Sequence, residues 1–320
     1  MSRIDRRKAP LLATIAVCAL LYGIAAWRYE GFATATVFVN FFADNAFLGI
    51  AAVGMTFVIL SGGIDLSVGA MVGLTSILVA VLVENCHMSP IIVIPLVLMI
   101  GTLIGAGMGA LIRYYAMPPF LVTLAGMFFA RGMAYVISVE SISLTHPYYV
   151  AMSEVRLPLF AGISLPLTAI IFIVVVLAGV YLSQFTRFGR NVYALGGNED
   201  AANLMGLPIG PTKMQVYALS GFCSALAGIV YTIYSSSGGP NNGVGLELDA
   251  IAATVVGGTP LTGGVGYVQG TMIGVLIFGI IQTGIMFQGT LSSWWTKMAV
   301  GILLLVFILL QKLLARTSAR

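Results

Sequence analysis

Long apolar runs separated by short polar segments follow one another along the whole chain. Runs of about 20 apolar residues can cross the roughly 30 Å hydrocarbon layer of a bilayer as helices, whereas strands of a membrane barrel are shorter and alternate polar with apolar positions. The pattern therefore predicts an all-α integral membrane protein with about ten transmembrane helices. The predicted spans lie near residues 10–27, 38–60, 66–83, 90–112, 118–138, 163–184, 214–234, 250–266, 268–288 and 296–314.

Composition supports this prediction, because 59% of the 320 residues are hydrophobic and only 8% are charged. A mean hydropathy of +1.02 is more apolar than a soluble protein of this size can hide from water. The longest polar intervals, 139–162 and 185–213, are too short for a soluble domain. We therefore expect residues 1–320 to form a single transmembrane domain, with a polar tail at 1–9.

The basic residues predict which side of the membrane each loop faces, since Lys and Arg collect in short cytoplasmic loops. Most of the 15 Lys and Arg residues fall on the side of the tail 1–9, the segment 185–213 and the C-terminus. Both termini and 185–213 are therefore expected in the cytoplasm, and 139–162 outside. The net charge of +4 follows from this topology and indicates no nucleic-acid partner.

The stretch LSGGIDLSVGA, residues 60–70, interrupts the apolar pattern with Asp65 and three glycines. An aspartate in the middle of a lipid-facing helix is costly, and glycine weakens a helix further. The chain is therefore expected to break at Gly62 and Gly63, with Asp65 capping the helix that begins near Leu66. Asp65 is either a simple cap in a surface turn or a cap that also lines a pathway.

The same spacing of residues follows Asp65 and Asp249. In each case a glycine follows at the eighth position and a threonine at the tenth. The two aspartates begin predicted spans three and eight, and an odd offset of five spans inverts the topology. We therefore expect two inverted-topology repeats with broken or re-entrant helices near Asp65 and Asp249, an arrangement typical of transporters.

Catalytic motifs are missing from the sequence. It contains no Gly-x-x-x-x-Gly-Lys-Ser/Thr phosphate loop, and His87 and His146 lie in separate loops without the spacing of zinc ligands. We therefore expect no enzyme activity, no metal site and no cofactor. Arg131, the basic residue well inside a span, needs carbonyls, water or an acidic partner, and it is either a clamp between helices or part of a gate.

The polar segment TRFGRNVYALGGNEDAANLMGLP, residues 186–208, predicts a short cytoplasmic helix over about 199–205. Asn198 is a good N-cap, and Glu199 and Asp200 fall in the first turn, where the helix dipole favours anions. Leu204 and Met205 stand among polar neighbours, which suits docking into a groove on another protein. The alternative is an ordinary connector helix that packs on its own bundle.

Four stretches carry a family resemblance: DNAFLGIAAVGMTFVILSGGIDLSVGA, PPFLVTLAGMFFARG, TRFGRNVYALGGNEDAANLMG and LELDAIAATVVGGTPLTGGVGYVQGTMIGV. They span about residues 44–274 and resemble the membrane permease subunits of bacterial ABC sugar importers of the ribose-type branch. Within that branch, HPYYVAMSEV and GTLSSWWTKMAVGILLL are most similar to one permease of the galactofuranose importer.

The resemblance implies a ten-span permease of the bacterial inner membrane that forms the pathway for a small sugar, a pentose or hexose. It implies cytoplasmic ATPase subunits, a periplasmic sugar-binding protein and a second permease, identical or related. The coupling element on the ATPase would then be formed by Gly196, Gly197, Asn198, Glu199, Asp200, Ala201 and Ala202. Asp65 and Asp249 match acidic positions of the family with pathway or capping roles.

A second hypothesis fits the inverted repeats equally well. It is a stand-alone secondary sugar transporter or facilitator driven by an ion gradient, with Asp65, Asp249 and Arg131 as candidate pathway residues. The two hypotheses differ in their energy source, because the importer requires ATP and a separate ATPase subunit.

Overall fold

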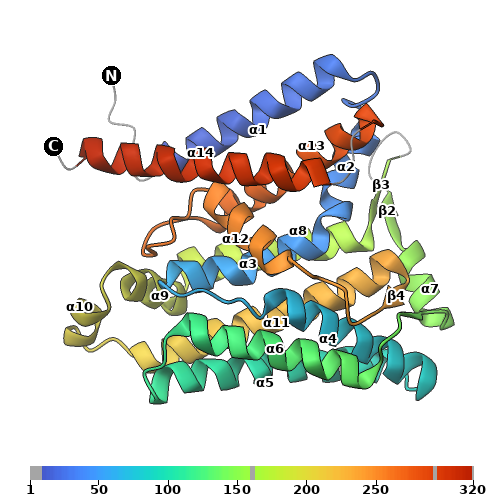
Figure 1. Ribbon diagram of the computed structural model, residues 1–320, viewed down its shortest axis with the longest axis horizontal. Helices are drawn as coiled ribbons and strands as arrows, with labels where there is room; N and C mark the ends of the chain where they lie inside the picture. The colour runs from blue at the N-terminus through green and yellow to red at the C-terminus, as the bar shows by residue number, and fades with distance from the viewer. Residues whose placement is uncertain (1–8, 159–162, 291–293, 319–320) are drawn as a thin grey trace.

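The computed structural model describes residues 9–158, 163–290 and 294–318, and most of them are helical (Figure 1). This confirms the predicted all-α membrane fold. The predicted tail 1–9, apart from Ala9, and residues 159–162 of the external loop lie outside the described residues. The helices are α1 (Ala9–Arg28), α2 (Ala35–Asp44), α3 (Ala46–Leu60), α4 (Val68–Ala80), the π-helical turn η2 (Val81–Asn85), α5 (Pro90–Tyr114), α6 (Pro119–Ile137), α7 (Pro147–Glu154), α8 (Leu167–Phe185), α9 (Arg187–Gly197), α10 (Glu199–Leu204), α11 (Ile209–Ser235), α12 (Leu246–Val256), α13 (Val268–Gln288) and α14 (Trp294–Ser318).

The described residues contain seven helices that are long and apolar enough to cross a membrane, or eight if the bent pair α2 and α3 counts as one span. The seven are α1, α4 with η2, α5, α6, α8, α11 and α13. α2 and α3 meet at an angle of 55°, so the predicted second span is bent. In α14, an apolar helix is described over Trp294–Phe307.

The predicted eighth span at 250–266 is wrong in its length. α12 has 11 residues and ends at Val256, and irregular backbone follows until α13 begins at Val268. Glycine at 258, 263 and 264 takes positive φ angles of 94°, 77° and 75° in this segment. Gly258 lies just past the end of the helix and prevents its continuation, while Gly263 and Gly264 shape the loop that follows; such left-handed conformations favour glycine because other residues clash there.

α3 lies at the centre of the bundle (Figure 1). Every residue of α3 except Phe47 is buried, and the helix packs against α11, α8, α12 and α13. A helix that is apolar on all sides is typical of a protein core or of a membrane span, and here other helices of the bundle surround it. Its one polar link to α13 is a hydrogen bond of 2.7 Å between the hydroxyls of Thr56 and Thr271.

The break predicted near Asp65 is present between α3 and α4. α3 ends at Leu60, Gly62 has a φ of 82°, and α4 begins at Val68. The amide of Gly63 donates to the carbonyl oxygen of Val58 at 3.0 Å, which satisfies one of the free carbonyls at the end of α3. Gly63, Asp65 and Ser67 are buried, whereas Gly62 is exposed, so the irregular backbone is covered by protein over part of its length.

Two small antiparallel sheets and α7 gather at one end of the molecule, while α9 and α10 lie at the opposite end (Figure 1). The start of α1 and the end of α14 lie at the same end as α9 and α10. One sheet pairs β1 (Ile142–Ser143) with β4 (Ser237–Gly238), and the other pairs β2 (Arg156–Pro158) with β3 (Ser164–Pro166). Glu84 holds the segment before α7, because its carboxylate accepts from the amides of Thr145 and His146 at 2.5 and 2.8 Å.

Candidate functional site

The segment that the sequence singles out for partner docking folds as two short helices, α9 and α10. The hydroxyl of Thr186 caps α9 by accepting from the amide of Gly189 at 3.1 Å. The side chain of Asn198 caps α10 by accepting from the amide of Ala201 at 2.8 Å. The short helix expected over about 199–205 is therefore confirmed, with its N-cap at the expected residue.

α10 turns its apolar side chains away from the bundle. Leu204 is 89% exposed and Met205 is 70% exposed, whereas Ala202 is buried. The Nζ atom of Lys213 on α11 lies 2.6 Å from the carboxylate of Glu199 and ties the start of α10 to its own chain. A connector helix that packs on its own bundle would bury Leu204, so this geometry favours docking of a partner.

The end of α9 touches the backbone at both helix breaks. A Cβ atom on Gly196 would lie 1.8 Å from the carbonyl oxygen of Leu60 and 2.7 Å from the amide nitrogen of Gly264. That amide donates a hydrogen bond of 2.9 Å to the same carbonyl of Leu60. A Cβ on Gly263 would lie 2.8 Å from the amide nitrogen of Gly62. We call this meeting of Leu60, Gly62, Gly196, Gly263 and Gly264 the glycine junction.

A side chain reinforces the junction. The hydroxyl of Tyr193 on α9 donates to the carbonyl oxygen of Gly266 at 2.8 Å. Burial raises the pKa of Tyr193 to about 12, so this donor keeps its proton at physiological pH. α9 is therefore in direct contact with the end of α3 and with the loop between α12 and α13. The glycines at 62–63 and 263–264 are visible in the sequence, but nothing in it shows that they meet.

Asp65 is buried, with 1% of its surface exposed. One carboxylate oxygen accepts from the amide of Ser67 at 2.9 Å and from its hydroxyl at 2.6 Å. The other oxygen accepts from the hydroxyl of Ser220 on α11 at 2.7 Å. Asp65 therefore lies inside the protein rather than in a surface turn, and it differs from the expected cap, because α4 begins at Val68 and Ser67 holds the N-cap position. A role of Asp65 in a pathway stays a prediction.

Asp249 has different surroundings from Asp65. It lies in the first turn of α12, and its carboxylate is 2.5 Å from the Nζ atom of Lys297 on α14. This ion pair remains partly open, since 54% of the Lys297 side chain and 22% of the Asp249 side chain are exposed. The sequence offers no sign of this pair, because the two residues are far apart along the chain.

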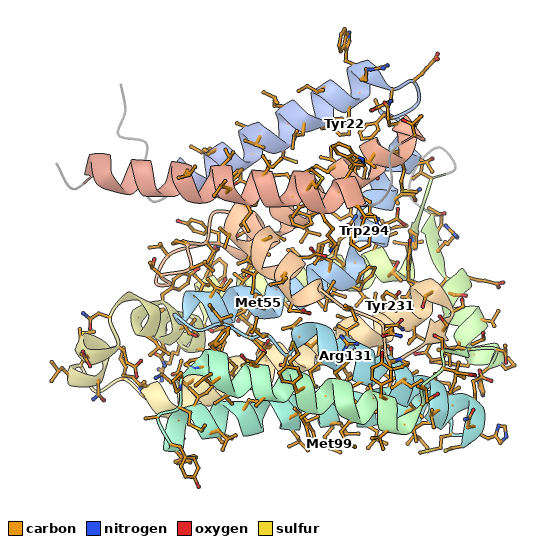
Figure 2. All side chains as sticks on the ribbon, viewed as in Figure 1. Tyr22, Met55, Met99, Arg131, Tyr231 and Trp294 are labelled. Atoms are coloured by element: carbon orange, nitrogen blue, oxygen red, sulfur yellow. The ribbon has the colours of Figure 1, made fainter. Side chains whose placement is uncertain are left out.

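The partner of Arg131 is backbone. Its Nη1 atom donates to the carbonyl oxygens of Pro240 and Asn242, with a distance of 2.9 Å to Asn242. Figure 2 shows Arg131 near the middle of the face turned to the viewer. Paired carbonyls lower the cost of about 2.5–3.5 kcal/mol that a charge incurs inside a span. Arg131 therefore clamps the segment before α12 to α6, and a role in a gate stays a prediction.

The structure does not gather Asp65, Asp249 and Arg131 into one cluster. Each has its own partners: hydroxyls on α4 and α11, a lysine on α14, and carbonyls before α12. Among the residues that the structure describes, no group of three or more His, Cys, Asp and Glu side chains could hold a metal ion. The described arrangement is that of a helical bundle with interrupted helices and a short helix, α10, with exposed apolar side chains at one end.

Comparison with known proteins agrees with this arrangement. The family described as branched-chain amino acid transport system / permease component matches residues 37–309. The chain is 50% identical over 307 residues to the inner membrane ABC transporter permease protein YjfF of Escherichia coli, covering 96% of this chain and 93% of that protein.

Two further relatives are named for the sugars that they import. The fructose import permease protein FruG of Bifidobacterium longum is 36% identical, with 97% of this chain and 92% of that protein covered. The ribose import permease protein RbsC of Haemophilus influenzae is 40% identical, with coverages of 85% and 83%. No solved structure matches the chain. The chain therefore belongs to the family of ABC transporter permeases described as branched-chain amino acid transport system / permease component.

Proposed function

We propose that this chain is the membrane permease of an ATP-driven sugar importer, and that it forms the pathway for a pentose or hexose across the bacterial inner membrane. The observation that carries the proposal is the match over almost the whole chain to permeases named for ribose and fructose import. The chain itself is a transport subunit, and hydrolysis of ATP belongs to a separate protein.

The cytoplasmic partner is an ATPase subunit that binds α10. Leu204 and Met205 supply an exposed apolar pair at the end of the molecule where α1 begins and α14 ends (Figure 1). Docking would bury these side chains, and the glycine junction would carry the motion of α9 and α10 to both helix breaks. With α10 in the cytoplasm, both chain termini lie in the cytoplasm and α7 lies in the periplasm.

The other partners are a periplasmic sugar-binding protein and a second permease, which is a related chain or a second copy. Galactofuranose is the proposed sugar, since the sequence resembles one of the two permeases of the galactofuranose importer over HPYYVAMSEV and GTLSSWWTKMAVGILLL. On this proposal the partner permease is a related second chain. Ribose, fructose and xylose are the competing substrates, because relatives are named for them.

Copurification followed by reconstitution tests the proposal. The tagged chain is extracted from its native membranes in mild detergent, its partners are identified by mass spectrometry, and the complex is placed in vesicles. An accompanying ATPase and sugar uptake that requires ATP are the expected results. Uptake by the chain alone, driven by an ion gradient, would establish the secondary transporter instead.

The docking helix has its own test. Replacing Leu204 and Met205 together with serine should release the ATPase without unfolding the permease, because both side chains are exposed. Charge reversal at Glu199 is a poorer choice, since it would also repel Lys213 within the chain. Tyr115→Ser is the control, because Tyr115 is 73% exposed but lies outside α9 and α10. Retention of the ATPase by the double variant would refute docking through α10.

A further inference from the structure

A polar strip runs along α6 and continues onto the segment that leads into α12. Phe128, Arg131 and Tyr135 are spaced by three and four residues, so they share one face of α6. Asn241 and Glu247 lie beside them. The hydroxyl of Tyr135 donates to the side-chain oxygen of Asn241, and Arg131 is held by the carbonyls on either side of that residue. We call these five residues the α6–α12 strip.

The strip is built on a fixed base. The side chain of Asn242 donates to the hydroxyl of Ser76 on α4 at 3.1 Å, and the same hydroxyl donates to the carbonyl oxygen of Gly239 at 3.2 Å. A Cβ on Gly73 would lie 2.9 Å from the carbonyl oxygens of Pro240 and Asn242, so α4 leaves room for this segment only because it has no side chain there. The polar groups of the strip are therefore held in place before any ligand arrives.

The two charged groups of the strip keep unused hydrogen-bonding capacity. Arg131 and Glu247 attract each other, yet among the described residues they form no ion pair. Arg131 uses only Nη1 for hydrogen bonds within the described part of the chain, which leaves Nε and Nη2 as donors. Within the described ranges, the hydrogen bonds of the Glu247 carboxylate come from backbone groups of its own turn. The unused donors of Arg131 and the carboxylate of Glu247 therefore lie near each other without a hydrogen bond between them in the described part of the chain.

An aromatic ring completes the strip. Phe128 is 67% exposed one turn before Arg131, so a flat apolar surface adjoins the unused donors and acceptors. A neutral sugar matches this combination, because its hydroxyls both donate and accept and its C–H face packs on an aromatic ring. A lipid chain would leave the charged groups without partners.

We propose that the α6–α12 strip is a contact site for the neutral sugar on its way through the permease, with Phe128 stacking on the ring and Arg131 and Glu247 bonding its hydroxyls. This inference rests on the proposed function. The donors and acceptors of the strip would replace, one after another, the hydrogen bonds that the sugar makes with the binding protein.

Two neighbouring phenylalanines give a matched test. Phe128 belongs to the strip, whereas Phe129 is also exposed but points from a different face of α6. Phe128→Leu, Glu247→Gln and Phe129→Leu are compared in vesicles that hold the complete transporter, its ATPase and its binding protein. Radiolabelled D-galactose, D-ribose, D-xylose and D-fructose serve as probes, and uptake per ATP hydrolysed is measured for each.

Phe128→Leu and Glu247→Gln should lower uptake per ATP by roughly three- to tenfold, and they should change the ratio of uptake among the sugars. Phe129→Leu should behave as the unaltered protein. Equal behaviour of the two phenylalanine variants, or an equal loss for every sugar, would overturn the contact site. Loss of the second permease from the Glu247→Gln complex would overturn it too, because the strip would then be a protein interface. Absence of ATP-dependent uptake of all four sugars by the unaltered complex would instead overturn the proposed function.

Discussion

At both the glycine junction and the α6–α12 strip, irregular backbone packs against helices. The two regions differ in the groups that make the contact. At the junction, the backbone of α9 touches the backbone at the end of α3 and in the loop before α13, with glycine at each contact. At the strip, side chains of Arg131 and Tyr135 reach across to the segment before α12. Tight backbone contact couples the movement of two segments, but it leaves no room for an added side-chain atom. Contact through side chains allows substitution of those residues and leaves polar groups that can bind a ligand.

The largest effect is expected at the junction, from Gly196→Ala. The new Cβ would lie 1.8 Å from the carbonyl oxygen of Leu60, so backbone must shift. We expect a loss of about 3 kcal/mol or more in the free energy of unfolding. Thermal unfolding of the purified chain in detergent measures it.

Gly197→Ala is the matched control for this prediction. A Cβ on Gly197 would meet no atom within 4 Å. Alanine is favoured over glycine in a helix by up to about 1 kcal/mol, so this variant should unfold no earlier than the unaltered chain. If both alanine variants unfold at the same temperature, the tight contact at Gly196 is not present in the protein.

The second largest effect is expected from Asp65→Ala. The change would leave the amide and hydroxyl of Ser67 and the hydroxyl of Ser220 without their acceptor inside the protein. Hydrogen bonds to charged groups are worth about 1.5–3 kcal/mol each, and we expect a loss of about 2 kcal/mol or more. Asp65→Asn keeps one acceptor oxygen for Ser67, so its free energy of unfolding should lie between those of Asp65→Ala and the unaltered protein. Equal stability of all three proteins would contradict the role of Asp65 as the buried acceptor for Ser67 and Ser220.

A smaller effect is expected from Arg131→Met at the strip. Methionine keeps much of the apolar stem but removes the donor for the carbonyls of Pro240 and Asn242, which should cost about 1 kcal/mol. Amide hydrogen exchange of residues 239–245 should speed up, while exchange within α9 stays unchanged. Arg131→Lys retains a positive donor and should be intermediate. Unchanged exchange in 239–245 would show that Arg131 does not clamp this segment.

The sequence predicts these two regions unequally, for physical reasons. Local patterns fix the cap at Asn198, the break after Leu60 and the exposed pair on α10, because each depends on neighbouring residues. The eighth span is predicted too long because α12 already ends at Val256, where Gly258 takes a positive φ angle just past the helix.

Contacts between distant residues could not be predicted in this way. The meeting of Gly196 with Leu60 and Gly264 joins three separate segments, and no single segment carries a sign of it. Asp65 and Asp249 are followed by the same spacing of glycine and threonine, but their partners differ. Hydroxyl groups bind Asp65, whereas Lys297 pairs with Asp249. The proposed inverted repeats therefore do not require equal roles for these two aspartates.

The smallest effect on stability is expected from Lys297→Gln, which removes the ion pair with Asp249 beside the strip. Because Lys297 is about half exposed, the loss should stay below about 1 kcal/mol in the isolated chain. The loss should become smaller in 1 M salt, because added ions weaken the attraction between partly exposed charges. Lys213→Gln, which removes the comparable pair with Glu199, is the control and should behave alike. A salt-independent loss in the isolated chain would contradict the open geometry. A loss that becomes salt-independent only in the assembled complex would show that a second permease covers Asp249 and Lys297.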